Sequence, residues 1–321
     1  MPPFVETILF VFLLIVVGYG AAAAKILKPG TDEGLSDFVF TIAIPLLLFR
    51  TLINADFTGG PPWGLWIAYF TSVAVTWTAG HLIIRKGYGR DARAGVVAGV
   101  TSAFSNLVLV GLPLVSGMFG DEGLLTLSLI ISVHLAIMLA TSMVLFEWAL
   151  HRDGVTASGE RRGPRAMLGN FVRQFLTNPL VIGILCGLAG RLIGKPLPPL
   201  ATRLVDTVAS VAGPLALVAM GMSLRKFGLH GHLVPALTLS AVKLVLMPAV
   251  ALVMALIIGL PPVPAQVAVI AASLPAGVNA WLIASRFNTG QRLASTAMTL
   301  ATGMAVVTTL AWALIAAAVF A

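Results

Sequence analysis

The residues best suited to bind a solute lie in an apolar stretch, 105–120, that an amide and two helix-disfavouring residues interrupt. These residues are Asn106, Gly111 and Pro113. In a lipid bilayer a helix can break only where protein or water satisfies the freed backbone groups. The stretch therefore predicts a broken membrane helix with a candidate solute site at the break.

A second apolar stretch, 273–279, is interrupted by Pro275 and Gly277 and ends in Asn279. Two interrupted helices in matching places of two halves are the usual sequence pointer to a transporter's binding site. A helix that restarts after a break exposes unpaired N–H groups and a partial positive charge, which suit a carboxylate. Asn106 and Asn279 would add donors without a permanent charge. The alternative for each amide is a bond between helices, typically worth about 0.6 kcal/mol.

The composition places these stretches in a membrane protein. Hydrophobic residues make up 58% of the 321 residues and charged residues 10%, and the mean hydropathy is +0.99. Soluble domains carry about 25% charged residues. The length leaves room for about ten spans of about 20 residues. We expect these spans at about 4–27, 35–54, 63–84, 92–118, 124–148, 172–193, 201–224, 233–258, 263–285 and 295–320.

The Lys and Arg residues are distributed unevenly among the connections between the expected spans. Fifteen of the twenty Lys and Arg residues follow odd-numbered spans. The positive-inside rule puts these connections in the cytoplasm and both termini outside it. The net charge of +8 then reflects topology, and we expect a lipid bilayer but no nucleic acid as partner. Glu6 stands where a signal peptide would carry Lys or Arg, which favours a retained first span in a bacterial inner membrane.

Three landmarks recur at one offset between the two halves of the sequence. The matched pairs are Gly18 and Gly187, Asp37 and Asp206, and Pro45 and Pro214. Each half holds five expected spans, an odd number, so the second half would form an inverted repeat of the first. We assign 1–148 to the first repeat, 149–171 to a basic cytoplasmic linker and 172–321 to the second repeat. Chance is the alternative, because Gly and Pro are frequent in membrane helices. The two matched prolines are further expected helix breaks.

Two other polar residues fall about midway along expected spans. His134 could contact the substrate, relay a proton, or serve as a neutral donor between helices. Lys243 is an intramembrane cation, and such residues are usually functional. We predict a coupling or support role for Lys243, with Asp37 and Asp206 as candidate partners. The alternative for both aspartates is helix capping. Arg50, near the outer end of its span, is expected to reach the interface.

At these residues the sequence resembles the auxin efflux carrier family, which includes plant auxin exporters and bacterial carriers of malonate and similar acids. The likeness covers essentially the whole chain. It is carried by Asn106-x4-Gly111-x-Pro113-Leu-x2-Gly117-Met-Phe-Gly120, Ile44–Phe49, Leu274-Pro-x-Gly277-Val, Ala284-x2-Phe-Asn288 and Ser295-Thr-Ala.

The resemblance implies an all-α protein of ten helices, with a scaffold domain and a transport domain that moves in an elevator-like way. It further implies that spans four and nine cross where they unwind, with the anion beside the crossing. Asn106 inherits the family's span-four substrate asparagine. Leu48 stands where plant members carry Ser, Asn279 where they commonly have Pro, and their long cytoplasmic loop is missing. These departures favour a small mono- or dicarboxylate over auxin.

We therefore predict a secondary transporter of the efflux-carrier type that moves a small organic anion, a mono- or dicarboxylate such as malonate or an auxin-like acid, by alternating access, without a cofactor or a bound metal. The direction of transport stays open, as do proton coupling, sodium coupling and uniport. The alternatives are a carrier-like solute sensor and an anion channel. No motif of an intramembrane enzyme is present, so we expect no enzymatic activity.

Small-residue faces such as Gly183-x3-Gly187 predict close helix packing. We expect this packing within the chain, and a homodimer stays open as the alternative.

Overall fold

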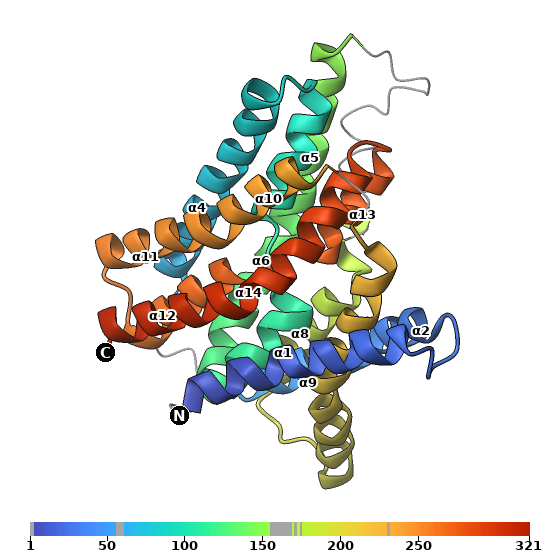
Figure 1. Cartoon of the computed structure of the whole chain (residues 1–321). Helices are drawn as coiled ribbons and strands as arrows, with labels where there is room; N and C mark the ends of the chain where they lie inside the picture. Colours follow the sequence, from blue (N-terminus) through green and yellow to red (C-terminus); the bar gives the residue numbers. More distant parts are fainter. Residues whose placement is uncertain (1–2, 56–60, 155–168, 170–171, 174, 230–231) are drawn as a thin grey trace. The chain divides into compact units, whose positions relative to one another are not determined.

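The computed structural model describes residues 3–55, 61–154, 169, 172–173, 175–229 and 232–321. These residues form helices without a strand, and one isolated β-bridge joins Ser105 to Ala276 (Figure 1). Most of the predicted basic linker, 149–171, lies outside the described residues.

Seven of the described helices are long and apolar enough to cross a membrane, so the chain is a polytopic membrane protein. They are Pro3–Ala23, Thr31–Ile53, Trp63–Gly87, Leu107–Arg152, Pro199–Phe227, Leu233–Ile258 and Gln291–Val319. Two shorter apolar helices are Pro179–Ile193 and Pro262–Ser273. The 46-residue segment Leu107–Arg152 is not one straight helix, because Gly120 has the non-helical angles φ 58° and ψ −143°. The ten spans stay a prediction.

The chain folds into two compact units, and each draws on both halves of the sequence. Unit 1 comprises Met1–Pro62, Val108–Val133 and Arg162–Lys226, and unit 2 comprises Trp63–Leu107, His134–Arg161 and Phe227–Ala321. The two units are defined by which residues pack together, not by symmetry between segments. They therefore do not test the predicted repeats at 1–148 and 172–321, which stay a prediction.

Unit 1 is built from short and long helices of both halves. Its elements are α1 (Pro3–Ala23), α2 (Thr31–Phe38), the π-helical turn η1 (Val39–Ala43), α3 (Ile44–Ile53), α8 (Pro179–Ile193) and α9 (Pro199–Phe227). The π-helical turn η3 (Leu107–Gly111) and α6 (Leu112–Arg152) contribute residues to both units.

Two glycines let helices of unit 1 approach each other at backbone distance. A Cβ on Gly18 of α1 would lie 2.1 Å from the carbonyl oxygen of Val218 on α9. A Cβ on Gly187 of α8 would lie 2.8 Å from the carbonyl oxygen of Phe49 on α3. Close approach through small residues is how membrane helices gain van der Waals contact. The small-residue face that includes Gly187 thus packs within the chain.

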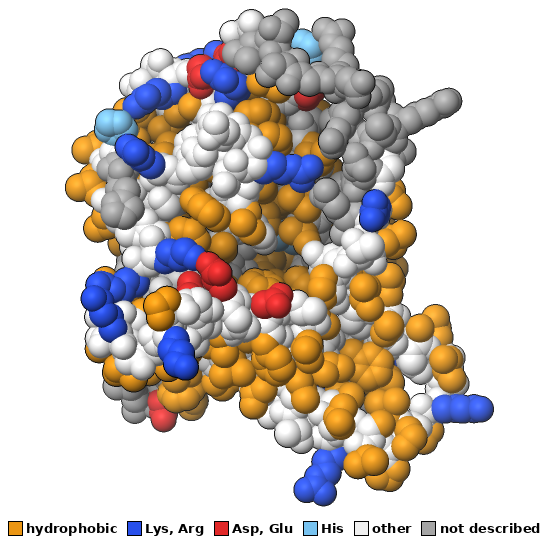
Figure 2. Space-filling model, turned by 90° about the vertical axis from the view of Figure 1, so that its right-hand side faces the viewer, with side chains coloured by type: hydrophobic (Ala, Val, Ile, Leu, Met, Phe, Trp, Pro, Cys, Tyr) orange, Lys and Arg blue, Asp and Glu red, His pale blue; other side chains and the backbone are white. Residues whose placement is uncertain are grey.

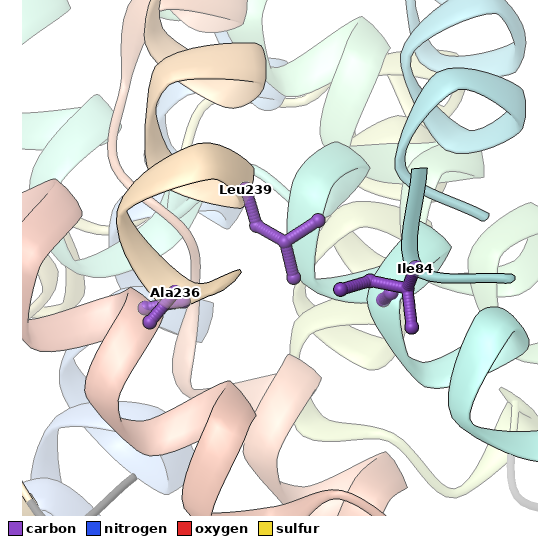
Figure 3. Packing of buried hydrophobic residues seen from close by; sticks show 5 residues of the cluster. Ile84, Ala236 and Leu239 are labelled. Atoms are coloured by element: carbon purple, nitrogen blue, oxygen red, sulfur yellow. The ribbon is translucent and has the colours of Figure 1, made fainter. Parts of the chain in front are cut away.

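Unit 2 contains the remaining helices. They are α4 (Trp63–Leu82), the π-helical turn η2 (Ile83–Gly87), α5 (Ala92–Ala103), α10 (Leu233–Ala241), the π-helical turn η4 (Val242–Leu246), α11 (Met247–Ile258), α12 (Pro262–Ser273), α13 (Val278–Arg286) and α14 (Gln291–Val319). The long helix α14 packs against α10 and α12 (Figure 1). Buried apolar side chains from η2, α5, α10 and α14 meet in one cluster (Figure 3). Its members are Ile84, Ala98, Ala236, Leu239 and Ala297.

The outer surface is that of a protein in lipid. Figure 2 shows hydrophobic side chains over much of one face, with Lys and Arg in small groups between them. Large apolar side chains that are exposed include Phe10, Leu13 and Val16 on α1. Apolar surface on this scale is stable next to acyl chains but not next to water.

Prolines follow three of the π-helical turns rather than breaking helices. Pro45, Pro113 and Pro248 are each the second residue of the helix that follows η1, η3 and η4. At Pro45 and Pro248 the residue before the α-helix is itself helical, so the chain continues as a helix through the proline and the widened turn accommodates it. The helix break expected at Pro45 is therefore wrong. The one expected at Pro214 is also wrong, because α9 runs unbroken through it, as membrane helices tolerate.

Pro248 leaves one carbonyl without its helical partner. In a regular α-helix the N–H of residue 248 would bond the carbonyl of Leu244, and proline has no N–H. Trp312 of α14 replaces this donor, since its indole Nε1 lies 2.9 Å from the Leu244 oxygen. The widened turn η4, which carries Lys243, is thereby fixed to α14.

Two aspartates cap the start of α5. The Asp91 carboxylate accepts from the Ala94 amide at 2.8 Å. Asp153 accepts from the amides of Ala92 and Arg93 at 2.9 and 3.0 Å and from the Arg93 guanidinium at 3.2 Å. Burial acts to raise the pKa of Asp153, but these amides and the guanidinium outweigh it and hold the pKa below the usual 3.8. Asp153 thus ties the residues after α6 to the start of α5.

We predict that Asp153→Ala lowers the thermal unfolding midpoint, by the equivalent of about 1 kcal/mol, because two amides of α5 lose their acceptor. Glu147→Ala removes an exposed carboxylate on α6 and serves as control, with a change below about 0.5 kcal/mol. Because the folded pKa is lowered, the Asp153 contribution is complete above the ordinary carboxyl pKa and lost as pH falls through the lowered value. Equal effects of the two substitutions would contradict the capping role.

We predict that Trp312→Phe destabilises the protein by about 1–2 kcal/mol, because the Leu244 carbonyl loses its donor in a buried turn. Trp63→Phe is the matched control, since Trp63 is 62% exposed and should give no measurable change. Thermal unfolding in detergent compares the two. An unchanged midpoint for Trp312→Phe would mean that water or another group replaces the indole.

Candidate functional site

Two extended segments of unit 2 cross and pair through their backbones. The helix α5 ends at Ala103 and α12 ends at Ser273. The Asn106 amide donates to the Pro275 carbonyl at 2.9 Å, and the Gly277 amide donates to the Phe104 carbonyl at 2.8 Å. These two bonds form the antiparallel bridge. We call residues 104–106 and 274–277 the crossing.

The first helix break lies earlier in the chain than Gly111 and Pro113, the residues at which the sequence predicted it. The non-helical residues are Phe104–Asn106, whereas Gly111 ends η3 and Pro113 is the second residue of α6. The breaks expected at Gly111 and Pro113 themselves are therefore displaced upstream. The second break includes Pro275, as the sequence predicted. The turn η3 begins at Leu107, directly after the crossing.

The crossing brings together two of the predicted substrate residues. A Cβ on Gly277 would lie 3.4 Å from the Asn106 Cα, so the two backbones are in contact. Asn106 is buried. Asn279 is the second residue of α13, two positions after Gly277, and is half-buried. The N-terminal turn of α13 therefore begins at the crossing, with the amides of its first residues outside the helical ladder.

Three of the carbonyls released at the end of α12 have side-chain donors. The Ile270 carbonyl accepts from the Ser273 hydroxyl at 2.9 Å. The Ser273 carbonyl accepts from the Thr309 hydroxyl at 3.2 Å, and the Ala272 carbonyl accepts from Lys243 at 2.6 Å. Unpaired backbone groups in lipid cost several kcal/mol each, so these donors permit the break.

Lys243 links the two broken segments through its ammonium group. The side chain is fully buried. Its Nζ donates to the Ser105 hydroxyl at 2.9 Å, to the Ala272 carbonyl at 2.6 Å and to the Met247 sulfur at 3.1 Å. Three acceptors match the three N–H bonds of an ammonium. Ser105 belongs to the first broken segment and Ala272 to the end of the helix before the second.

The aspartates considered as partners of Lys243 lie elsewhere, in unit 1. Asp37 accepts from the Thr41 hydroxyl at 3.2 Å, and Asp206 lies 3.8 Å from Arg50. Within the described residues no carboxylate forms an ion pair with Lys243. The pairing with Asp37 or Asp206 stays a prediction, and the described acceptors of Lys243 are neutral groups.

His134 lies in an aromatic cage of unit 2. Its ring is T-shaped to Phe104 at 4.8 Å and to Tyr69 at 5.7 Å, and stacked on Phe70 at 6.3 Å between centroids. The side chain is 4% exposed, and neither ring nitrogen has a hydrogen-bond partner within the described residues. Because Phe104 is the first residue of the crossing, the cage places the imidazole beside it.

The sequence analysis missed several residues of this site. Among them, Ser105 and Met247 hold Lys243, and Phe104 connects the crossing to His134. Two usable signals were present: Ser105 stands next to Asn106 at the helix break, and Met247 follows Lys243 by four residues, which places the two side chains on one helix face. Nothing in the sequence pairs Phe104 with His134.

Two cavities among the described residues of unit 1 bear on the site. The larger, of about 630 Å³, lies between α1, α3, the first turns of α6 and α9. Pro113 and Pro214 both line it, together with Glu6 and Arg50. The smaller has a volume of about 410 Å³ and lies between the ends of α3 and α8 and the start of α9. Arg50 lines both cavities.

Comparison with known proteins also indicates a membrane transport protein. The family model of membrane transport proteins matches residues 3–313. The chain is 28% identical over 243 residues to the "Putative malonate transporter" of Rhizobium meliloti (strain 1021), covering 70% of each chain. It is 25% identical over 246 residues to an "Uncharacterized transporter" of Methanothermobacter thermautotrophicus, covering 75% of this chain and 74% of that one.

A third relative is the "Lysosomal cholesterol signaling protein" of Mus musculus, at 24% identity over 246 residues. The match covers 73% of this chain but 28% of the mouse protein. The family match spans nearly the whole sequence and agrees with the motifs around Asn106 and Gly277. The chain is therefore a member of the auxin efflux carrier family of membrane transport proteins.

Proposed function

We propose that the protein is a secondary transporter that moves a small organic anion, a mono- or dicarboxylate such as malonate, by alternating access with the carboxylate bound at the crossing. The observation that carries this proposal is the pair of broken helices joined by backbone bonds and by Lys243. The family and the name of the rhizobial relative support the class of solute.

The charge distribution around the crossing favours an anion. The carbonyl end of α12 is occupied by Lys243 and Thr309, so its partial negative charge is already compensated. The amide end of α13 begins at Val278 and attracts negative charge. We assign Asn106 and Asn279 as side-chain donors to the carboxylate and Gly277 as the point of close backbone approach.

Lys243 has a support role in this proposal. Protonated, it brings a positive charge into unit 2 without a carboxylate among its described contacts. A buried charge of this kind is costly unless it is compensated. A bound anion close to the crossing would provide that compensation, and the free energy gained would add to its affinity.

The inverted repeat is part of the proposal, and the packing of unit 1 supports it. Gly18 contacts the carbonyl of Val218, and Gly187 contacts that of Phe49. The offset that takes Gly18 to Gly187 also takes Phe49 to Val218. We propose ten spans in two inverted five-helix repeats, an elevator-like movement of the part that carries the crossing, and termini outside the cytoplasm of a bacterial inner membrane.

We predict that Asn106→Ala abolishes both malonate-dependent thermal stabilisation and malonate counterflow in proteoliposomes. The fold should persist, because the bond to Pro275 uses the Asn106 backbone amide, which alanine keeps. Gln266→Ala, which removes an amide side chain from α12, is the control and should keep both signals. Ligand stabilisation that survives in Asn106→Ala would remove this residue from the site, and counterflow absent from the unaltered protein would exclude a carrier of malonate.

We predict opposite effects of His134→Phe on the free and the ligand-bound protein. Phenylalanine fits an aromatic cage and removes two buried nitrogens without partners, so the unliganded protein should gain about 1–3 kcal/mol. The malonate-dependent shift should shrink, because the substrate loses a donor. Thermal unfolding with and without malonate measures both. An unchanged shift would make the imidazole structural.

A carrier-like sensor is the second candidate, favoured by the likeness to the mouse signalling protein. That protein is much longer than the matched region, so a related membrane domain occurs there together with other segments. Counterflow separates the two candidates, because only a carrier exchanges labelled solute across the membrane.

A further inference from the structure

A second group of cations converges on the smaller cavity of unit 1. Arg50 at the end of α3, Arg191 at the end of α8 and Lys195 just beyond α8 line it, with Asp206 of α9 as the one carboxylate. The volume of about 410 Å³ is typical of a small-molecule site. Phe49 and Leu197 supply apolar walls.

Few Lys and Arg residues occur in the connections on this side of the expected spans, so their convergence on one cavity is unexpected. The connections after even-numbered expected spans hold three basic residues, Arg191, Lys195 and Arg203. Membrane proteins deplete this side of Lys and Arg. Yet two of the three line one cavity, and Arg50 joins them from the end of another span. The cations that remain on this side are therefore concentrated in one place.

Two of the cations around the cavity, Arg50 and Lys195, have donors to spare among the described residues. The Arg50 guanidinium lies 3.8 Å from the Asp206 carboxylate, too far for a hydrogen bond, and donates none within the described residues. Lys195 likewise has no ion pair there. The Arg50 side chain is 30% exposed, so it is accessible but partly removed from water. Charge-assisted bonds to an anion are stronger under such conditions.

Helix dipoles explain only part of the arrangement. Arg50 lies in the last turn of α3 and Arg191 in that of α8, where a cation compensates the partial negative charge. Each helix end would be served equally well by a side chain that points away from the cavity. Lys195 lies beyond the Gly194 cap, outside the last turn of α8. The dipoles do not account for the convergence of all three cations.

We propose that this cavity is a second anion site, which binds a carboxylate or phosphate group through Arg50, Arg191 and Lys195. It lies in unit 1, whereas the crossing lies in unit 2, so it goes beyond the proposed function. The same chemistry is offered by a free dianion and by the headgroup of an anionic lipid. Either would be held by bidentate contact with a guanidinium and by the lysine charge.

The test uses the full chain with Asn106→Ala, so that binding at the crossing does not contribute. Lys195→Gln is compared with Arg203→Gln, an exposed cation near the start of α9 that does not line the cavity. Both positions are exposed, so both variants should fold. Thermal midpoints are measured with malonate, with inorganic phosphate, and in phosphatidylcholine nanodiscs with and without phosphatidylglycerol.

We expect Lys195→Gln to weaken binding of one of these probes about tenfold and Arg203→Gln to leave it unchanged. A Lys195-dependent shift with malonate or phosphate identifies a free anion. A Lys195-dependent shift with phosphatidylglycerol identifies a lipid headgroup. No shift with any probe, or equal losses in both variants, overturns the proposal. If the unaltered protein binds no anion at the crossing, only the proposed function is contradicted. The cavity is tested separately, in the Asn106→Ala background.

Discussion

The structure of unit 2 depends on one constraint, that no backbone polar group in lipid can stay without a partner. Two helices end inside the apolar part of the chain, and each end exposes carbonyls and amides. The broken segments satisfy part of this demand with each other, through Asn106, Pro275, Phe104 and Gly277. Side chains from other helices, Lys243 and Thr309, satisfy two further carbonyls. These donors stabilise the helix breaks, and the candidate site is formed by the broken segments.

The same partners also separate charge. Lys243 and Thr309 serve the carbonyl end of α12, and the amide end of α13 starts a few residues later. In the proposed function, a solute with a negative charge binds at the second end, where side-chain amides and backbone N–H groups are near. Neutral donors would hold such a solute less tightly than an arginine, so that it could also leave. Lys243 would supply a positive charge, and its described acceptors are all neutral groups.

Much of the fold and part of the candidate site could be predicted from the sequence. The remaining features could not, for physical reasons. The family, the helical membrane class and the presence of two breaks followed from motifs and from Pro and Gly in apolar stretches. The position of the first break did not, because Pro113 begins a helix while the extended residues lie at Phe104–Asn106. The distant partners of Lys243, Ser105 and Ala272, could not be predicted, since a hydroxyl and a carbonyl leave no charge pattern. The π-helical turns depend on hydrogen-bond geometry that composition does not encode.

The bonds of Lys243 have a mechanical consequence. Because one ammonium holds Ser105 and Ala272 together, pulling the two broken segments apart would break at least one of these bonds and leave a buried hydroxyl or carbonyl without its donor, at about 1–3 kcal/mol. The two segments are therefore expected to move together as one rigid element. In the proposed function, access to either side of the membrane would then come from displacement of the whole crossing or from changes in the helices around it.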